Sequence, residues 1–323
     1  MVARLQVPIQ TTVRDRVAAA SISFVVPVYN SEHTLEPLLE RIGLITQALN
    51  VPSEAILVND GSTDRSWAVI VSLSNRHSWI RGINLMRNYG QHNALLCGVR
   101  AARHEVIVTM DDDLQHPPEE VPRLLAKLDA YDVVYGKPLR QTHGLARDLA
   151  SRITKLALQS AIGAEVASHV SAFRAFRSYV RDAFADYRGS YVSLDVLLTW
   201  GTGRFTAVEV RHDLRLVGRS NYSFGKLIAH AMNMMTGFSI LPLELASLLG
   251  FAFTLLGMVM LLFVLGRYVL QGSPVPGFPF LASVIAIFSG AQLFALGIIG
   301  EYLARVHSRL MDCPTYSVRS TTD

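Results

Sequence analysis

The stretch Val106-Ile-Val-Thr-Met-Asp-Asp-Asp-Leu-Gln115 joins a short apolar run to three consecutive carboxylates and a side-chain amide. The apolar run is typical of a buried β-strand, and the polar residues stand where such a strand would end. Adjacent carboxylates repel one another unless a cation neutralises them, and their oxygens suit a hard divalent ion such as Mg²⁺ or Mn²⁺. An isolated acidic triplet is more often a solvated loop, so its place after a strand is the informative feature. We therefore predict a site for a metal-bound diphosphate at this strand end.

Four further β-rich runs lie around this stretch and alternate with helical patterns. They are Ile22–Val28, Ala55–Val58, Ile80–Leu85 and Val133–Tyr135. The apolar face of the helix expected after the first run is Leu35, Leu38, Leu39, Ile42 and Ile45, and that of the helix after Pro117-Pro118 is Val121, Leu124, Leu125 and Leu128. This alternation predicts an α/β fold with a parallel sheet, in which ligands bind beyond the carboxyl ends of the strands.

Polar segments follow the first three of these runs. They are Pro27-Val-Tyr-Asn30-Ser-Glu32, Asn59-Asp60-Gly-Ser-Thr-Asp64 and Arg87-Asn-Tyr-Gly-Gln-His92. None of the runs leads into GxGxxG or GxxxxGK[ST], the glycine-rich loops that cradle phosphates in dinucleotide-binding and P-loop proteins. We therefore expect the strand-end residues and a metal ion to hold the diphosphate.

The C-terminal part of the chain has the composition of a membrane protein. The 323 residues are 50% hydrophobic and only 17% charged, which disfavours both disorder and a purely soluble globule. Leu245–Gly266 and Gly277–Gly300 lack charged residues, and each reaches the length of about 20 residues that crosses a bilayer. Gln271–Gly277 between them is too short and too rich in turn residues to fold alone. These features predict a transmembrane helical hairpin.

Basic residues flank the open end of this hairpin. Arg215, Arg219 and Lys226 precede it, Arg305 and Arg309 follow it, and Arg267 alone is near the connector. The positive-inside rule then puts both ends in the cytoplasm. Helical apolar spacing between Phe224 and Leu241 predicts an interfacial helix, with an ordinary core helix as the alternative. The expected organisation is a loose tail at 1–20, a globular domain at 21–221, an interfacial region at 222–241, membrane helices within 242–306 (about 245–269 and 278–303), and a cytoplasmic tail at 307–323.

Charge and cysteine content exclude other classes. A net charge of +4 without a block of Lys or Arg disfavours nucleic acid and suits an anionic membrane surface. Cys97 and Cys313 lie far apart without metal-ligand spacing, which argues against a disulfide framework or a zinc site.

Four motifs in this order resemble those of glycosyltransferase family 2 enzymes. They are Val25–Asn30, Asn59–Asp64, Arg87–Gly90 and Asp111–Glu119. Together with the hairpin and Gly297–Arg305, they resemble the branch that uses polyprenyl phosphates: dolichyl-phosphate mannose synthases, bactoprenol glucosyltransferases and undecaprenyl-phosphate aminoarabinose-type transferases. The resemblance covers about residues 21–316. It implies a Rossmann-like GT-A catalytic domain, then interfacial amphipathic helices and a C-terminal two-helix transmembrane hairpin.

The resemblance implies a role for individual residues. Contacts to a nucleotide-sugar donor are implied for Pro27, Val28, Tyr29, Asn30, Glu32, Asp60, Asn88, Gly90, Gln91, Asp111, Asp112 and Arg215. Metal ligands are implied at Asp111, Asp113 and Gln115, and acceptor-phosphate contacts at Arg140, Arg147, Ser151 and Arg174. The catalytic group is then Asp111, Asp113, Arg140 and Arg147, since guanidinium groups suit a phosphate.

Some of these positions have a structural alternative. Asp60 would hydrogen-bond the base, but Asp-Gly is also a common turn pair. Arg147 is alternatively a solvated helix residue. Asp112 stands where relatives have a small residue, and Ser168 and Asn221 depart from the usual acidic residue and lysine. His92, His116 and His169 are interpreted as polar loop residues.

The implied reaction is inverting, metal-dependent transfer of a sugar to the phosphate of a polyprenyl phosphate. The bacterial character of the motifs favours a UDP-sugar over a GDP-sugar and undecaprenyl phosphate as acceptor. A phosphate acceptor is largely anionic at neutral pH, so it needs no strong general base. A processive polysaccharide synthase and a non-catalytic nucleotide-sugar-binding scaffold are the alternatives, and a homo-oligomer such as a tetramer is left open.

Overall fold

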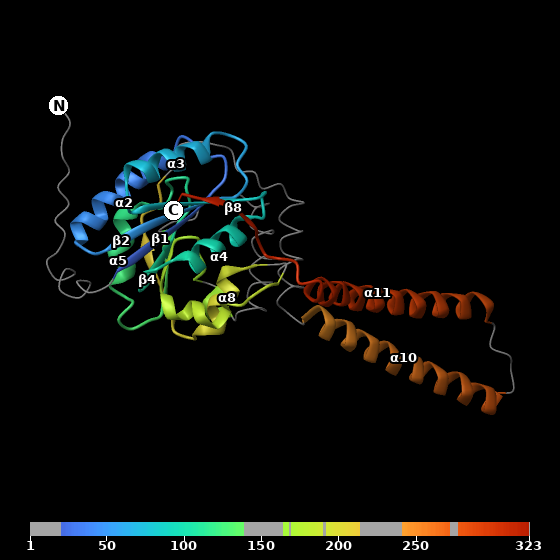
Figure 1. Cartoon of the computed structure of the whole chain (residues 1–323). Coiled ribbons are helices and arrows are strands. Elements are labelled where there is room, and N and C mark those ends of the chain that lie inside the picture. Colours follow the sequence, from blue (N-terminus) through green and yellow to red (C-terminus); the bar gives the residue numbers. More distant parts are fainter. Residues whose placement is uncertain are drawn as a thin grey trace.

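The computed structural model describes residues 21–138, 164–167, 169–189, 192–213, 241–271 and 277–322. In this part of the chain one eight-stranded sheet has the order β7-β5-β6-β4-β1-β2-β3-β8 (Figure 1). The strands are β1 (Ile22–Val28), β2 (Ser53–Asn59), β3 (Ile80–Leu85), β4 (Val106–Thr109), β5 (Val133–Pro138), β6 (Arg174–Arg177), β7 (Phe205–Val210) and β8 (Val318–Thr321). β1 pairs in parallel with β2 and β4, and β2 with β3, so their carboxyl ends meet at one edge.

Helices cover both faces of the sheet, with α2 and α3 on one face and α4 and α8 on the other (Figure 1). The helical elements of the globule are α2 (Leu35–Leu49), α3 (Ser66–Arg76), α4 (Gln91–Ala101), η1 (Pro118–Glu120), α5 (Val121–Leu125), α7 (Ala164–Ala167), η2 (Ser178–Phe184) and α8 (Leu194–Gly201). Phe24 and Val26 pack on the first face, while Val25 between them packs on the second. Burial on both faces explains why β1 is apolar along most of its length.

The expected strands and first helix are confirmed with small shifts at their ends. The run expected from Ala55 begins at Ser53, and the run that starts at Val106 ends at Thr109, one residue before Met110. The second expected helix is shorter: α5 ends at Leu125, and Leu128 reaches the core from the following turns. β6 is antiparallel to both β4 and β5, and the sequence pattern gave no sign of β6, β7 or β8.

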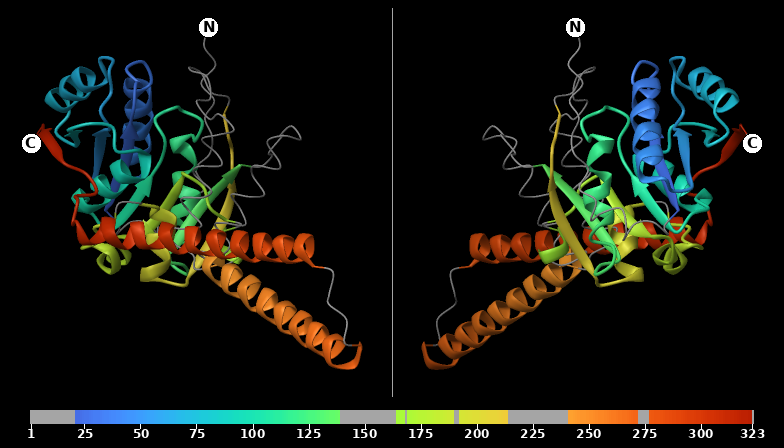
Figure 2. Two further views of the ribbon diagram at one scale, coloured as in Figure 1. Left: turned by 90° about the vertical axis from the view of Figure 1, so that its right-hand side faces the viewer. Right: turned by 90° about the vertical axis from the view of Figure 1, so that its left-hand side faces the viewer.

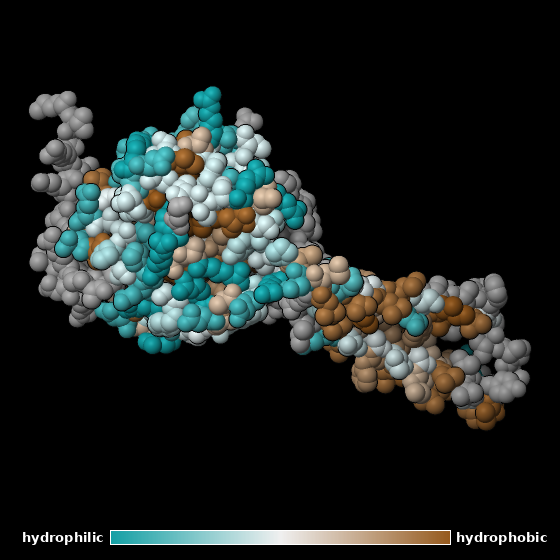
Figure 3. Space-filling view, viewed as in Figure 1, coloured by the Kyte–Doolittle hydropathy of each residue, from teal (hydrophilic) through white to brown (hydrophobic). Residues whose placement is uncertain are grey.

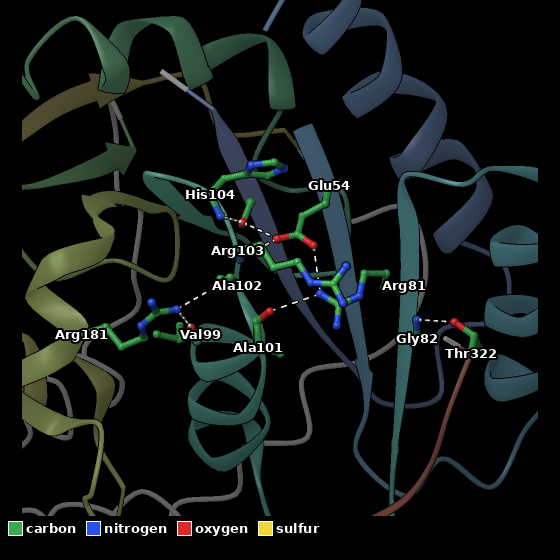
Figure 4. Close-up of polar contacts among 11 residues, drawn as sticks. Glu54, Arg81, Gly82, Val99, Ala101, Ala102, Arg103, His104, Arg181 and Thr322 are labelled. Carbon is green, nitrogen blue, oxygen red and sulfur yellow. Dashed lines mark hydrogen bonds and ion pairs between the residues drawn. The ribbon is translucent and has the colours of Figure 1, made fainter. Parts of the chain in front are cut away.

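The buried carboxylate of Glu54 lies at the end of the sheet opposite the strand-end loops. Glu54 accepts hydrogen bonds from the Ser23 hydroxyl (2.7 Å), the Arg103 N–H (2.7 Å) and the Arg81 guanidinium (3.0 Å) (Figure 4). Burial acts to raise the pKa of Glu54, but these hydrogen bonds and the charge of Arg81 outweigh it and lower the pKa. The cost of burying this charged carboxylate is therefore offset by its hydrogen bonds and its ion pair.

Two arginines cap the C-terminus of α4 at the same end. Arg81 donates to the Ala101 carbonyl (3.2 Å), and Arg181 donates to the carbonyls of Val99 (3.1 Å) and Ala102 (2.7 Å) (Figure 4). Cations at this position satisfy the last carbonyls of a helix and complement its dipole. The cap fixes α4, whose other end faces the strand-end loops.

Two long apolar helices extend away from the globule as a hairpin (Figures 1 and 2). They are α10 (Leu241–Gln271) and α11 (Phe278–Leu310), and Phe253 packs edge-on against Phe288 between them. Within the described residues, the stretches long and apolar enough to cross a membrane are Pro242–Phe263 and Ile287–His307, and both are almost entirely exposed. Figure 3 shows apolar residues over the visible surface of both helices. The two helices of the expected hairpin are therefore present, and the second begins at Phe278 as expected.

The last residues of the chain correct one expectation. In place of a tail over 307–323, α11 continues to Leu310, and Val318–Thr321 form β8, antiparallel to β3. The chain therefore returns from the hairpin to the edge of the sheet. The expected loose segment 1–20 and most of the interfacial region 222–241 lie outside the described residues.

Candidate active site at the strand ends

Loops that follow β1, β2, β3 and β4 enclose a cleft of about 320 Å³. Its lining residues are Pro27, Val28, Tyr29, Asp60, Asn88, Gly90, Gln91, Asp111, Asp112 and Asp113. Each is among the residues that the sequence singles out. The structure brings them together because the four strands are parallel and end at the same edge of the sheet.

Asp60 fixes the loop that follows β3. Its carboxylate is 3% exposed and accepts hydrogen bonds from the backbone N–H groups of Tyr89 (2.7 Å) and Gly90 (2.9 Å). Burial raises the pKa of Asp60, and the two hydrogen bonds oppose this effect. The carboxylate expected to hydrogen-bond the nucleotide base is thus already bound to backbone N–H groups of the protein.

Gly61 brings the same two loops into direct contact. Its φ of +66° lies in the left-handed region, and a Cβ atom there would lie 2.4 Å from the Asn88 nitrogen. Only glycine combines this backbone conformation with so close an approach. The loops after β2 and β3 therefore form one packed unit beside the cleft.

Asn30 and Glu32 tie the loop after β1 to the loop after β2. The Asn30 side-chain oxygen accepts a hydrogen bond from the Thr63 N–H (2.8 Å), and Glu32 accepts one from the Arg65 N–H (3.0 Å). Neither lines the cleft. These two residues therefore hold the two loops together, and their contact to a donor stays a prediction.

The acidic loop after β4 separates its three carboxylates. Asp111 accepts a hydrogen bond from the Gln91 amide (2.6 Å), and Asp113 accepts one from the Gln115 N–H (3.1 Å). Asp112 accepts one from the Tyr29 N–H (3.3 Å). Burial raises the pKa of Asp112 to about 6, partly opposed by hydrogen bonds, among them that of Tyr29. The extra carboxylate of this sequence is therefore bound to the loop after β1.

The cleft fits a divalent cation by the chemistry of its donors. Asp111 and Asp113 both line it, whereas Gln115 does not. Among the described residues no three His, Cys, Asp or Glu side chains already surround a common metal position. Two carboxylates and a side-chain amide form an oxygen-only set that suits Mg²⁺ or Mn²⁺, with diphosphate oxygens as natural further ligands.

Arg174 is placed differently from expectation. Its side chain is 2% exposed and forms an ion pair with Asp195, which also accepts a hydrogen bond from the Tyr135 hydroxyl (3.1 Å). A guanidinium enclosed in this way is not presented to a lipid phosphate. The expected acceptor contact is therefore not met, because Asp195 from α8 satisfies the charge inside the core.

Several expected residues lie outside the described part of the chain. They are Arg140, Arg147, Ser151 and Arg215, together with Ser168 and Asn221. Two histidines interpreted as polar loop residues are structural instead. His92 accepts a hydrogen bond from the Leu194 N–H (3.3 Å), and His116 is buried against Phe173. Burial and the neighbouring His212 lower the pKa of His116 to about 4, so it is neutral at physiological pH.

The end of β7 supports the acidic loop, which sequence analysis missed. The Asp213 N–H donates to the Gln115 carbonyl (2.9 Å), and the ring of His212 meets that of His116 at 5.0 Å. Arg41 binds Glu119 through two hydrogen bonds. The motif that carries the candidate metal ligands is thus held from two sides.

Comparisons with known proteins agree with this fold. The glycosyl transferase family 2 model matches residues 23–184. The structure of glucosyl-3-phosphoglycerate synthase from Mycobacterium tuberculosis with Mn²⁺ and UDP-glucose superposes with a TM-score of 0.52 at 20% identity, covering 70% of this chain and 80% of that one. The fold and the site define a glycosyltransferase with a GT-A fold.

Relatives of known name extend the similarity to the hairpin. Undecaprenyl-phosphate 4-deoxy-4-formamido-L-arabinose transferase from Pectobacterium carotovorum is 33% identical over 93% of both chains. The protein of the same name from Yersinia enterocolitica is 34% identical over 92% of both chains. The chain belongs to glycosyltransferase family 2, as the sequence motifs predict.

Proposed function

We propose that this chain transfers a sugar from a nucleotide-diphosphate sugar to the phosphate of a polyprenyl phosphate. A UDP-sugar is the favoured donor, and undecaprenyl phosphate is the favoured acceptor. The product is a lipid-linked monosaccharide with inverted configuration at the anomeric carbon. The observation that carries this proposal is the union in one chain of an acidic strand-end cleft and an exposed apolar hairpin.

The donor half of the proposal rests on the residues of the cleft. Tyr29, Asn88 and Gln91 surround the space in which the nucleotide diphosphate would bind. Asp111, Asp113 and Gln115 would hold Mg²⁺ or Mn²⁺. A bound cation would neutralise the negative charge that develops on the departing nucleoside diphosphate. Gln91, hydrogen-bonded to Asp111, orients that carboxylate.

The acceptor half rests on the hairpin and on the lipid's own chemistry. A phosphate monoester carries a second pKa near 6 when phosphoserine is the guide, so its oxygen is already nucleophilic at neutral pH. We assign Arg140, Arg147 and Ser151 to the acceptor phosphate and Arg215 to the diphosphate. Because this anionic acceptor needs no strong general base, a serine at 168 is compatible with turnover.

The membrane placement follows from the same sequence features. The hairpin lies in the inner membrane, with the catalytic domain and both termini in the cytoplasm, where nucleotide sugars are made available. The basic residues at its open end, including Arg305 and Arg309, face that side. Self-association into a tetramer is the assembly to test first.

The test is label transfer by the detergent-purified protein from a panel of UDP- and GDP-sugars to undecaprenyl phosphate. Mg²⁺ and Mn²⁺ are supplied in separate reactions, and a chelator is the control. We expect a chelator-sensitive, lipid-linked monosaccharide. Polymer formation would mark a processive synthase, and nucleotide binding without turnover on any donor would mark a scaffold; either result overturns the proposal.

A further inference from the structure

The chain segment that follows α11 lies along the free edge of β3 (Figures 1 and 2). The Met86 N–H donates to the Ser317 carbonyl (2.9 Å), and the Thr322 N–H donates to the Gly82 carbonyl (3.0 Å). The Gly82 N–H in turn donates to the Thr322 hydroxyl (2.8 Å), as Figure 4 shows. We call residues 315–322 the return segment.

The return segment is also anchored by its side chains. Thr315 is buried, and Tyr316 packs against the α4 face of the sheet beside Cys97. The guanidinium of Arg100 lies 5.8 Å from the centre of the Tyr316 ring. Backbone pairing and this anchor hold the segment at a fixed place beside the loop that follows β3.

Tyr89 connects the return segment to the cleft. The Met86 N–H at the start of its loop is bound by the Ser317 carbonyl. The Tyr89 side chain lies beside Ser317, and Arg87 lies over the Tyr89 ring at 4.7 Å from the ring centre. Its backbone N–H is bound by Asp60 from the inner side. The loop after β3 is therefore bound both by the buried Asp60 carboxylate and by the return segment.

The gripped loop supplies part of the cleft wall. Asn88 and Gly90, on either side of Tyr89, both line the cleft. Asp60 binds the backbone of this loop at Tyr89 and Gly90, and the Ser317 carbonyl binds it at Met86. A change at Ser317 would therefore reach the cleft through Tyr89.

We infer that the return segment is a positioning element of the donor subsite: Ser317 holds Tyr89, and Tyr89 holds Asn88 and Gly90 in the shape that binds the nucleotide diphosphate. This inference rests on the proposed function. It makes the last residues of the chain, more than two hundred positions beyond the loop, a determinant of donor affinity. Protection of a bare sheet edge is the competing role, and it predicts altered stability with unaltered donor affinity.

The test measures binding of UDP, with Mn²⁺ present, to the full-length protein in detergent by calorimetry. Ser317→Ala and Tyr89→Phe each remove one hydroxyl of the link, and Ser317→Thr retains it. Asp312→Asn is the matched control, because it weakens the exposed Arg188–Asp312 ion pair in the same stretch without touching the loop. Thermal unfolding of each variant verifies that it is folded.

We expect Ser317→Ala and Tyr89→Phe to raise the Kd for UDP about threefold to fivefold, close to the effect of one hydrogen bond. Ser317→Thr and Asp312→Asn stay within twofold of the wild type. In turnover assays the donor KM rises in the two weakened variants while the KM for the lipid is unchanged.

The remaining outcomes separate the two proposals. Wild-type protein that binds neither UDP nor GDP would overturn the proposed function and this inference with it. Wild-type binding with an unchanged Kd in both hydroxyl variants overturns the inference alone. The same holds if Ser317→Thr loses as much affinity as Ser317→Ala, or if only the unfolding temperature changes.

Discussion

The two ends of the sheet treat buried carboxylates in opposite ways. Glu54, at the end away from the cleft, has the cation Arg81 and two further hydrogen-bond donors, and its pKa is lowered. Asp60, at the cleft, receives two neutral backbone donors, and burial raises its pKa. The carboxylate at the far end is therefore paired with a cation of the protein. Within the described part of the chain, the carboxylate at the cleft is bound by neutral donors only, so a cationic ligand can still neutralise it.

The largest effect should come from removing one cleft carboxylate. We expect Asp113→Asn to lower kcat by about a thousandfold or more, because the cation loses a charged ligand and several kcal/mol of charge stabilisation. Label transfer to the lipid measures this loss, and thermal unfolding verifies the fold.

Asp112→Asn is the matched control, since the Asp112 carboxylate accepts a hydrogen bond from the Tyr29 N–H, and the oxygen of an amide can accept the same bond. We expect it to retain activity within about tenfold. Equal losses in the two variants would erase the distinction between them, and near-normal turnover in Asp113→Asn would refute its metal role.

At the opposite end, Glu54→Ala should lower the free energy of unfolding by about 3 kcal/mol, because it leaves Arg81 and two donors without their acceptor. Arg76→Ala, which breaks the exposed pair with Glu36, should cost less than about 1 kcal/mol. Chemical denaturation of the purified protein gives both values. A similar cost in both variants would remove the stabilising role of the far end.

A backbone change beside the cleft should have an intermediate effect. Gly61→Ala forces a Cβ atom against Asn88, so we expect donor binding to weaken about tenfold as the loop moves. Gly203→Ala is the control, since a Cβ atom there meets no neighbour within 4 Å. Calorimetry with UDP decides, and unchanged affinity in Gly61→Ala would separate this contact from the donor subsite.

The smallest expected effect is a difference in pH dependence. The lowered pKa of Glu54 stabilises the fold above its ordinary value of 4.5, and this contribution is lost as the pH falls below that value. The raised pKa of Asp60 has the opposite sign: it opposes folding increasingly as the pH rises above 3.8. The measurement is the free energy of unfolding against pH. As the pH rises, we expect the wild type to become more stable relative to Glu54→Gln and less stable relative to Asp60→Asn. Parallel curves would contradict the contrast between the two ends.

Much of the cleft could be predicted because parallel strands impose it. Once β1, β2, β3 and β4 are recognised as parallel, the residues after each strand must converge. The ten lining residues were found in this way. The role of each within the cleft was harder to predict. Asp112 and Asp60 bind backbone of neighbouring loops, and no pattern in the chain reveals which carboxylate faces a ligand.

The missed features depend on partners that are distant in sequence. Arg174 is a charged residue among apolar ones, but its partner Asp195 lies on α8, so the ion pair is not visible in the sequence. β8 is short and exposed, and Val318 is its one apolar residue, so it has no apolar alternation to detect. His116 is buried because Phe173, just before β6, and His212, just after β7, cover it. Such features emerge only when the sheet order is known.

The order of the strands places the return from the hairpin at one edge of the sheet. The chain leaves the described globule just after β7 and returns as β8, and these are the two outermost strands. The return is short, because only residues 311–317 separate the end of α11 from β8. A fully extended chain spans at most about 3.6 Å per residue. The end of α11 therefore stays within about 30 Å of the start of β8, whatever the tilt of the hairpin.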